Sequence, residues 1–250
     1  MAERITSKTN PTVQHVKKLL ASRKYRYEVR AFVADGSKLA EEALRWGVGV
    51  DALILREDVD FPVPAGVREI RVPEALMRDL SRMDSPQGVL ALCRMPEPRP
   101  LELSPGCLIL DGIQDPGNLG TILRTADAFE RPVLLSEGCA DPYSEKVVRA
   151  TMGAVFRTPP LQADARDLLA ACRAAGIPLC VTALSPRARD IRSLPLTDYA
   201  VVIGSEGRGV SPVFLEAADL EAIIPMSERC ESLNAAVAAA VVLWQMRGRL

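Results

Sequence analysis

The chain has 250 residues, 48% of them hydrophobic and 25% charged, and a formal net charge of −1 at pH 7. This balance is typical of a globular protein with a sizeable core, and it excludes a disordered polyelectrolyte. Aromatic residues make up only 4% of the chain, so the core must consist mainly of Val, Leu, Ile and Ala. Such a composition favours an α/β fold with buried parallel strands.

The first 34 residues form a basic segment, because they carry eight Lys and Arg side chains against two Glu. Tyr25, Tyr27 and Phe32 lie in or beside this cluster. Charge alone leaves two interpretations open, a solvated helix face or a patch that contacts RNA. The candidate RNA-binding residues are Lys8, Lys17, Lys18, Arg23, Lys24, Arg26 and Arg30.

The first 95 residues alternate between predicted helices and strands. Asn10 followed by Pro11 predicts a helix start, because Asn caps well and Pro suits the first turn. The remaining elements are a strand at 31–34, a helix at 37–46, a strand at 52–55, a helix at 74–80 and a strand at 88–93. This order predicts a small α/β domain over residues 1–95. Four prolines between Arg94 and Pro105 predict an extended linker at 96–105.

Residues 106–250 repeat the alternation on a larger scale. Continuous apolar runs predict strands at 107–110, 133–135, 178–183, 199–203 and 222–224. Helical patterns lie at 119–130, 145–152, 165–175, 212–218 and 234–247. Short apolar strands between amphipathic helices indicate a parallel sheet covered on both faces. Ligands of such sheets bind at the loops after the carboxyl ends of the strands.

Three of these loops could carry chemistry. The first, 111–120, leads into a helix on which Asn118 is a possible cap and Arg124 lies off the buried stripe. The second, 204–209, has three glycines that could expose backbone amides, but it is neither a P-loop nor a dinucleotide fingerprint. The third runs from Ile224 to Asn234, where Ser232 or Asn234 could cap the last helix. Each loop alone also has a plain interpretation as a turn or a cap.

The six cysteines and the single histidine, His15, contain no C-x-x-C pair or other zinc pattern, so no metal is expected. Free cysteines in apolar stretches are typical of a reducing compartment. The first ten residues lack the apolar core of a signal peptide. The longest apolar run, 235–244, is too short to cross a bilayer. We therefore expect a cytoplasmic protein with no membrane segment.

Read together, the three loops resemble the motifs of the SpoU (TrmH-like) branch of the SPOUT methyltransferase superfamily. The motifs stand here as 118–120 with Arg124, as 203–210, and as 224–226 with 231–234. The N-terminal part resembles the L30e-like RNA-binding extension of that family at 5–7, 10–11, 32–36 and 85–89. Two departures are Asp35 before Gly36, where Glu is commoner, and the segment 227–230, where relatives have smaller residues.

The resemblance implies a methyltransferase domain with a deep trefoil knot, working as a homodimer. It implies an S-adenosyl-L-methionine-dependent RNA (ribose-2′-O-)-methyltransferase, with 23S ribosomal RNA favoured by the N-terminal extension. The alternatives are a transfer RNA methyltransferase and a non-catalytic RNA-binding or ribosome-assembly protein. A dehydrogenase is more distant, because no dinucleotide fingerprint follows the first strand of the second domain.

The resemblance also implies the site residues. The implied cofactor-binding residues are Thr182, Ala183, Leu184, Gly204, Glu206, Gly207, Ile224, Met226 and Leu233. The implied catalytic residues are Arg124, Asn118, Ser232 and Asn234. A guanidinium loses its proton with great difficulty, so Arg124 is expected to clamp a phosphate and polarise the 2′-hydroxyl. Asn118 would hold its loop, and Ser232 and Asn234 would orient the ribose or relay the proton.

Overall fold

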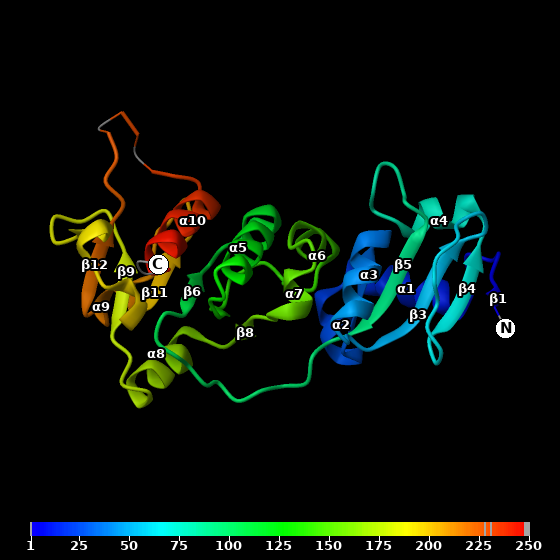
Figure 1. The fold of residues 1–250 in the computed structure, drawn as a ribbon, viewed down its shortest axis with the longest axis horizontal. Helices are drawn as coiled ribbons and strands as arrows, with labels where there is room; N and C mark the ends of the chain where they lie inside the picture. Colours follow the sequence, from blue (N-terminus) through cyan, green and yellow to red (C-terminus); the bar gives the residue numbers. More distant parts are fainter. Residues whose placement is uncertain (1, 228, 231, 248–250) are drawn as a thin grey trace. The chain divides into compact units, whose positions relative to one another are not determined.

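The computed structural model describes residues 2–227, 229–230 and 232–247, and Figure 1 traces the chain. The chain divides into two compact units. The first contains the residues up to Glu97 together with Asp141–Arg157, and the second contains Pro98–Ala140 together with the described residues from Thr158 onward. The segment 141–157, which the sequence pattern assigned to the second domain, therefore packs within the first unit. The chain passes between the units three times rather than once.

The first unit is built on a five-stranded mixed sheet of order β1-β4-β3-β5-β2. Strand β3 pairs in parallel with β4 and antiparallel with β5, and β5 pairs antiparallel with β2. The strands are β1 (Glu3–Arg4), β2 (Ala31–Asp35), β3 (Val50–Arg56), β4 (Arg68–Val72) and β5 (Val89–Arg94). The helices before the linker are α1 (Pro11–Ala21), α2 (Arg23–Val29), α3 (Ser37–Arg45) and α4 (Glu74–Leu80).

Alternate residues of β3 supply two different cores, as the pleat of a strand requires. Ala52 and Ile54 belong to a core with α1 and α4. Leu53 and Leu55 belong to a core with α3 and the segment 141–157. That segment carries helices α6 (Glu145–Ala150) and α7 (Ala154–Arg157). One face of the sheet is therefore completed by residues that come much later in the chain.

Aromatic side chains hold the segment 141–157 in the first unit. The rings of Phe32 and Tyr143 lie 5.1 Å apart, and those of Phe32 and Phe156 lie 6.2 Å apart. Tyr143 and Phe156 are 5% and 8% exposed, so the segment buries large apolar side chains there. The carboxylate of Glu42 on α3 also accepts a hydrogen bond of 2.7 Å from Arg157.

Arg26, one of the expected RNA contacts, is buried in this unit. Its Nε atom donates to Asp141 Oδ2 at 2.8 Å, and its Nη1 atom donates to the Leu19 carbonyl. The hydroxyl of Tyr27 donates to the other carboxylate oxygen of Asp141 at 3.1 Å. Because Arg26 is 5% exposed, it cannot reach RNA in this fold, and that expectation is corrected. The positive charge of Arg26 could not indicate from the sequence that Asp141, 115 positions away, would be its partner.

We expect Arg26→Ala to lower the free energy of unfolding by about 3–5 kcal/mol, because it leaves the buried Asp141 carboxylate without its cation. The double variant Arg26→Ala, Asp141→Ala should lose less than the sum of the two single variants, and urea denaturation followed by circular dichroism measures all of them. RNA affinity of the folded variant should change little. A large loss of affinity with unchanged stability would return Arg26 to the RNA-contacting surface.

The second unit contains a seven-stranded sheet of order β10-β12-β9-β11-β6-β7-β8, in which every recorded strand pair is parallel. The parallel sheet predicted from the apolar runs is thus confirmed. Its strands are β6 (Leu108–Asp111), β7 (Val133–Leu135), β8 (Leu161–Gln162), β9 (Leu179–Thr182), β10 (Arg189–Asp190), β11 (Ala200–Gly204) and β12 (Leu220–Ile223).

Helices cover both faces of this sheet (Figure 1). The helices are α5 (Pro116–Ala128), α8 (Ala165–Ala174), α9 (Pro212–Glu216) and α10 (Ala235–Met246). Leu168 of α8 and Phe214 of α9 pack in one core with Ile109 and Val202 of the sheet. Helices α5 and α10 pack against each other. In the described part of the chain, no helix is long and apolar enough to span a membrane. The trefoil knot stays a prediction.

Five of the six cysteines are buried free thiols. Burial raises the pKa of Cys93, Cys107 and Cys180 to about 12, so these thiols are protonated at neutral pH. A thiol in that state is neither a nucleophile nor a good metal ligand. Their contribution is packing.

Candidate active site

Three chain segments meet at the carboxyl edge of the parallel sheet in the second unit. Strand β6 leads into α5, strand β11 leads into the glycine-rich loop, and β12 leads into the segment before α10. Gly204 at the end of β11 pairs with Asp111 at the end of β6. Asp111 accepts hydrogen bonds of 2.7 Å from the Ser136 hydroxyl and from the Ser211 amide, which ties the start of the first loop to the residue after β7 and to the end of the glycine-rich loop.

Glu206 joins all three segments through one carboxylate oxygen. Its Oε1 atom accepts hydrogen bonds from Asn118 Nδ2 at 2.8 Å, from Asn234 Nδ2 at 2.7 Å and from the Ala235 amide at 2.9 Å. Asn234 Nδ2 also donates to Asn118 Oδ1 at 3.1 Å. Asn118, Glu206 and Asn234 come from the first, second and third motif respectively, so this network holds the motifs in register.

Helix capping explains two of these positions. Asn234 caps α10, since its Oδ1 atom accepts from the amides of Ala236 and Val237 at 3.0 and 3.2 Å. The cap of α5 is Asp115, whose Oδ1 atom accepts from the Asn118 amide at 2.8 Å. Asn118 is therefore not the N-cap that the sequence suggested. Its side chain is free to bind Glu206 instead.

The glycine-rich loop folds back on itself so tightly that Gly204 has no room for a side chain. A Cβ atom there would lie 2.1 Å from the Gly209 carbonyl carbon. The amide of Gly209 donates to the Ser205 carbonyl at 2.8 Å, and Gly209 has a φ angle of +66°. The glycines thus permit a close backbone turn at the end of β11.

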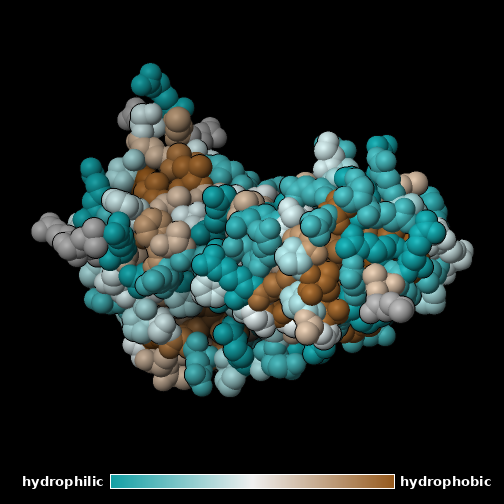
Figure 2. All heavy atoms as spheres, turned by 45° about the vertical axis from the view of Figure 1, so that its right-hand side comes forward, coloured by the Kyte–Doolittle hydropathy of each residue, from teal (hydrophilic) through white to brown (hydrophobic). Residues whose placement is uncertain are grey.

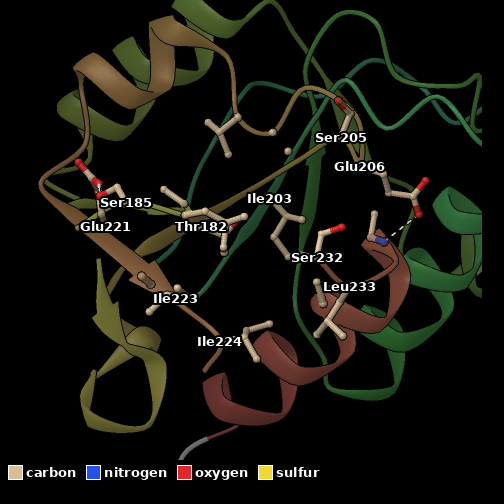
Figure 3. Close-up of a pocket in the computed structure, with 18 of the residues that line it drawn as sticks. Thr182, Ser185, Ile203, Ser205, Glu206, Glu221, Ile223, Ile224, Ser232 and Leu233 are labelled. Carbon is tan, nitrogen blue, oxygen red and sulfur yellow. Dashed lines mark hydrogen bonds between the residues drawn. The ribbon is translucent and has the colours of Figure 1, made fainter. Parts of the chain in front are cut away.

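A cavity of about 600 Å³ opens beside this network, which is within the usual size range of small-molecule pockets. Figure 3 shows Thr182, Ile203, Ile224 and Leu233 around it. Figure 2 shows apolar atoms gathered just below the tip of the projecting segment that connects β12 to α10. All the residues expected to bind a cofactor line this cavity: Thr182, Ala183, Leu184, Gly204, Glu206, Gly207, Ile224, Met226 and Leu233.

One end of the cavity is polar, and the sequence did not reveal it. The Glu221 carboxylate accepts hydrogen bonds from the Ser185 hydroxyl and from the Arg187 guanidinium, and its side chain is only 9% exposed. All three residues line the cavity, and Figure 3 shows Ser185 and Glu221 together at the end away from Glu206. Glu221 precedes the apolar run from which the strand was predicted, so the sequence placed it in a loop. The signal that could have revealed this polar end was the carboxylate directly before an apolar strand.

A smaller hollow of about 270 Å³ lies against the same network. Asn118, Gln114 and Arg208 line it, and Glu206 lines both cavities. The larger cavity has an apolar centre and the smaller one is lined mainly by polar side chains. This arrangement suits two ligands that meet at Glu206, a flat apolar group in the larger cavity and a polar group in the smaller one.

The structure brings three of the four expected catalytic residues to these cavities. Asn118 lines the smaller hollow, Ser232 lines the larger cavity, and Asn234 joins them through Glu206. Arg124 lies on α5 with its side chain exposed, and it lines neither cavity. It is six residues from Asn118, or about 9 Å along the helix axis.

The basic cluster of the first unit is partly neutralised. Lys17 and Lys8 lie 2.5 and 3.6 Å from Asp79, and Arg30 donates to the Pro96 carbonyl. Lys18 lies over the Tyr25 ring, and Arg23 lies over the Tyr27 ring, at 5.6 and 5.4 Å from the centroids. Lys24 is exposed. In the part of the chain that the structure describes, Lys18 and Lys24 make no ion pair with an acidic side chain, so they are the cations of this cluster best placed for an external anion.

A parallel sheet with this pocket, closed by three motif-bearing loops, defines the second unit as a SPOUT-type methyltransferase domain. The chain belongs to the SpoU rRNA Methylase family, whose model matches residues 105–244. A second model, the MRM3-like substrate binding domain, matches residues 10–91. These matches confirm the family resemblance and the fold class that the motifs implied.

Relatives match nearly the whole chain. The 23S rRNA (guanosine(2553)-2′-O)-methyltransferase RlmP of Bacillus subtilis is 33% identical, over 98% of this chain and all of the relative. The 23S rRNA (uridine(2479)-2′-O)-methyltransferase of Streptomyces viridochromogenes is 29% identical, over 98% of this chain and 91% of the relative. An AdoMet-bound crystal structure of an rRNA methyltransferase from Sinorhizobium meliloti is 33% identical with a TM-score of 0.87, covering 98% of this chain and 97% of the other.

Proposed function

We propose that this protein is an S-adenosylmethionine-dependent RNA methyltransferase that methylates a ribose 2′-hydroxyl, with 23S ribosomal RNA as its substrate. The observation that carries the proposal is the hydrogen-bond network of Glu206, which joins the cofactor-sized cavity to the smaller polar hollow. The names of the full-length relatives support the same reaction. We place the protein in the cytoplasm.

The residues of the larger cavity fit S-adenosylmethionine. Ile203, Ile224 and Leu233 offer apolar contacts for an adenine ring, while the backbone of 182–184 and of the glycine-rich loop can supply polar contacts. Glu221 and Ser185 would meet hydroxyl or ammonium groups at the polar end. When bound there, the cofactor supplies an electrophilic methyl group.

The protein's own residues would then position the acceptor. Glu206 would hold the side chains of Asn118 and Asn234 in place, so that they could orient the ribose. Such positioning can lower the activation barrier by on the order of 7–11 kcal/mol in favourable cases. Ser232 would orient the 2′-hydroxyl or take up its proton. Arg124 would clamp the adjacent phosphate and polarise the hydroxyl, because a guanidinium stays protonated and can donate two parallel hydrogen bonds.

We propose a homodimer and an RNA-recognising role for residues 1–95. On α10, Val237 and Trp244 are 50% and 62% exposed, which is unusual for large apolar side chains and is consistent with a covered surface. For RNA contact within the basic cluster we retain Lys18 and Lys24. Binding through these cations should weaken as salt rises.

The test is to incubate the protein with 23S ribosomal RNA, transfer RNA and labelled S-adenosylmethionine, and to map ribose methylation by nucleotide. We expect one 2′-O-methylated nucleotide in 23S ribosomal RNA. Methylation of transfer RNA alone would favour the alternative substrate. Absence of cofactor binding at millimolar concentration in calorimetry would favour a non-catalytic RNA-binding protein.

We expect Glu206→Ala to weaken cofactor binding and to lower methyl transfer by about 10–100-fold, because it removes the acceptor of three hydrogen bonds that hold the motifs together, each worth about 0.5–1.5 kcal/mol. Glu206→Gln keeps an acceptor oxygen and should retain most of the binding. Calorimetry with S-adenosylhomocysteine and single-turnover kinetics measure the two effects. Equal, large losses in both variants would show that the charge of Glu206 matters rather than its hydrogen bonds.

A further inference from the structure

Trp46 is an exposed aromatic residue in the first unit that the proposed function does not use. It follows the last residue of α3, and its side chain is 49% exposed. Its indole Nε1 atom donates to Glu42 Oε2 at 3.2 Å. Glu42 is itself buried and held by Arg157 at 2.7 Å and by Lys38 at 3.3 Å. The indole therefore has a defined orientation although half of it faces solvent.

Positive charge surrounds this ring. The guanidinium carbons of Arg45 and Arg157 lie 5.9 and 5.7 Å from the ring centroid, within the range of a cation–π contact. Arg157 and Lys38 both pair with the buried carboxylate of Glu42, whereas Arg45 contacts the ring itself. The exposed part of the indole thus lies in a locally cationic environment.

If the indole only shielded the ion pair of Glu42 and Arg157 from water, full burial would stabilise the first unit more. Apolar area that stays exposed adds no hydrophobic stabilisation. A half-exposed, oriented indole beside guanidinium groups is the arrangement with which proteins stack unpaired bases and hold the adjoining phosphate. Trp46 and Arg45 lie within residues 10–91, the part that matches a substrate-binding model.

We propose that Trp46 is a stacking site for an unpaired nucleobase of the RNA, with Arg45 and Arg157 holding the phosphate beside it. This inference rests on the proposed function, because it assumes an RNA substrate. It assigns to the first unit a contact separate from Lys18 and Lys24 of the basic cluster. It also gives the segment 141–157 a part in RNA binding, since Arg157 is its last residue.

The test uses the fluorescence of Trp46 in full-length protein. The chain has two tryptophans, so Trp244→Phe leaves Trp46 as the only indole reporter. Titration with a single-stranded oligonucleotide and with a 23S ribosomal RNA fragment should quench that fluorescence. In the same background, Trp46→Ala should raise the Kd for RNA by about ten-fold or more, since stacking on one aromatic side chain commonly contributes that much. Trp46→Phe should retain most of the affinity.

Arg45→Gln is the companion variant, because Arg45 makes no part of the Glu42–Arg157 ion pair. It should weaken RNA binding and reduce the dependence of log Kd on log salt concentration by about one unit if one phosphate contact is lost. Thermal unfolding of each variant shows whether the fold is kept. In methylation assays with varied RNA concentration, Trp46→Ala should raise the KM for RNA while kcat stays near the wild-type value.

The outcomes separate this inference from the proposed function. The stacking site alone would be overturned if RNA did not quench the fluorescence of Trp244→Phe and if Trp46→Ala left the Kd for RNA unchanged, while the wild-type protein bound and methylated RNA. A fall in Tm with unchanged RNA affinity would also overturn it, because Trp46 would then only stabilise the first unit. If the wild-type protein bound no RNA at all, the proposed function would fail together with the inference.

Discussion

Arg124→Ala is expected to remove most methyl transfer, on the order of 10²–10³-fold in kcat, as loss of a preorganised charge at a reaction centre does. Arg124 is exposed on α5 and lines neither cavity. Among the described residues it makes no ion pair or side-chain hydrogen bond. Its removal should therefore leave the Glu206 network, the fold and the affinity for S-adenosylhomocysteine nearly unchanged.

Arg124→Lys is the matched variant, because lysine keeps the charge but loses the planar fork of donors. We expect it to recover only part of the activity if a bidentate phosphate contact is needed. Single-turnover methylation with a saturating RNA fragment measures the chemical step, and calorimetry measures cofactor binding. Full turnover by Arg124→Ala would remove Arg124 from the mechanism.

Deleting residues 1–97 is expected to leave a C-terminal fragment that is poorly soluble or is cleaved rapidly within 141–157. In the full chain this segment buries Tyr143, Val148, Val155 and Phe156 against the first unit, where each is at most 8% exposed. Without that unit these side chains would face water, and burial of each is worth about 1.5–3 kcal/mol. Limited proteolysis and the yield of soluble fragment are the measurements.

The control replaces 141–157 in the same fragment with a glycine–serine segment of equal length. This second fragment should be soluble and should bind S-adenosylhomocysteine, because every residue that lines the two cavities belongs to the second unit. A soluble, protease-resistant first fragment would mean that 141–157 folds independently of residues 1–97. The division of the chain at a single linker would then be the better description.

Where a strand is buried on both faces, local sequence was enough to predict it. The apolar runs before Asp111 and before Gly204 are both central strands of the parallel sheet, because a doubly buried strand must be apolar throughout. Strand β4, with sequence REIRV, was missed, since its charged residues alternate with Ile70 and Val72, which are 1% exposed. The two-residue strands β1, β8 and β10 are too short for any pattern.

The site residues in the motifs, like the central strands, could be predicted from local sequence. Asn118, Glu206 and Asn234 could be named from the sequence, because each belongs to one of the short motifs that resemble the family. The bond that joins them could not, since Glu206 reaches Asn118 and Asn234 across 88 and 28 positions. The polar end of the cavity at Glu221 was invisible for the same reason: its partners Ser185 and Arg187 come from another loop.

The sequence by itself determined the family, the parallel sheet and the loops that carry the site, because these depend on periodicity and on short motifs. Only the tertiary structure decided that 141–157 completes the first unit, that Arg26 is buried against Asp141, and that Trp46 is oriented at the surface. Hydrophobic periodicity tells which face of a helix is buried and not what buries it. Charge in a sequence, likewise, does not tell which partner will neutralise it.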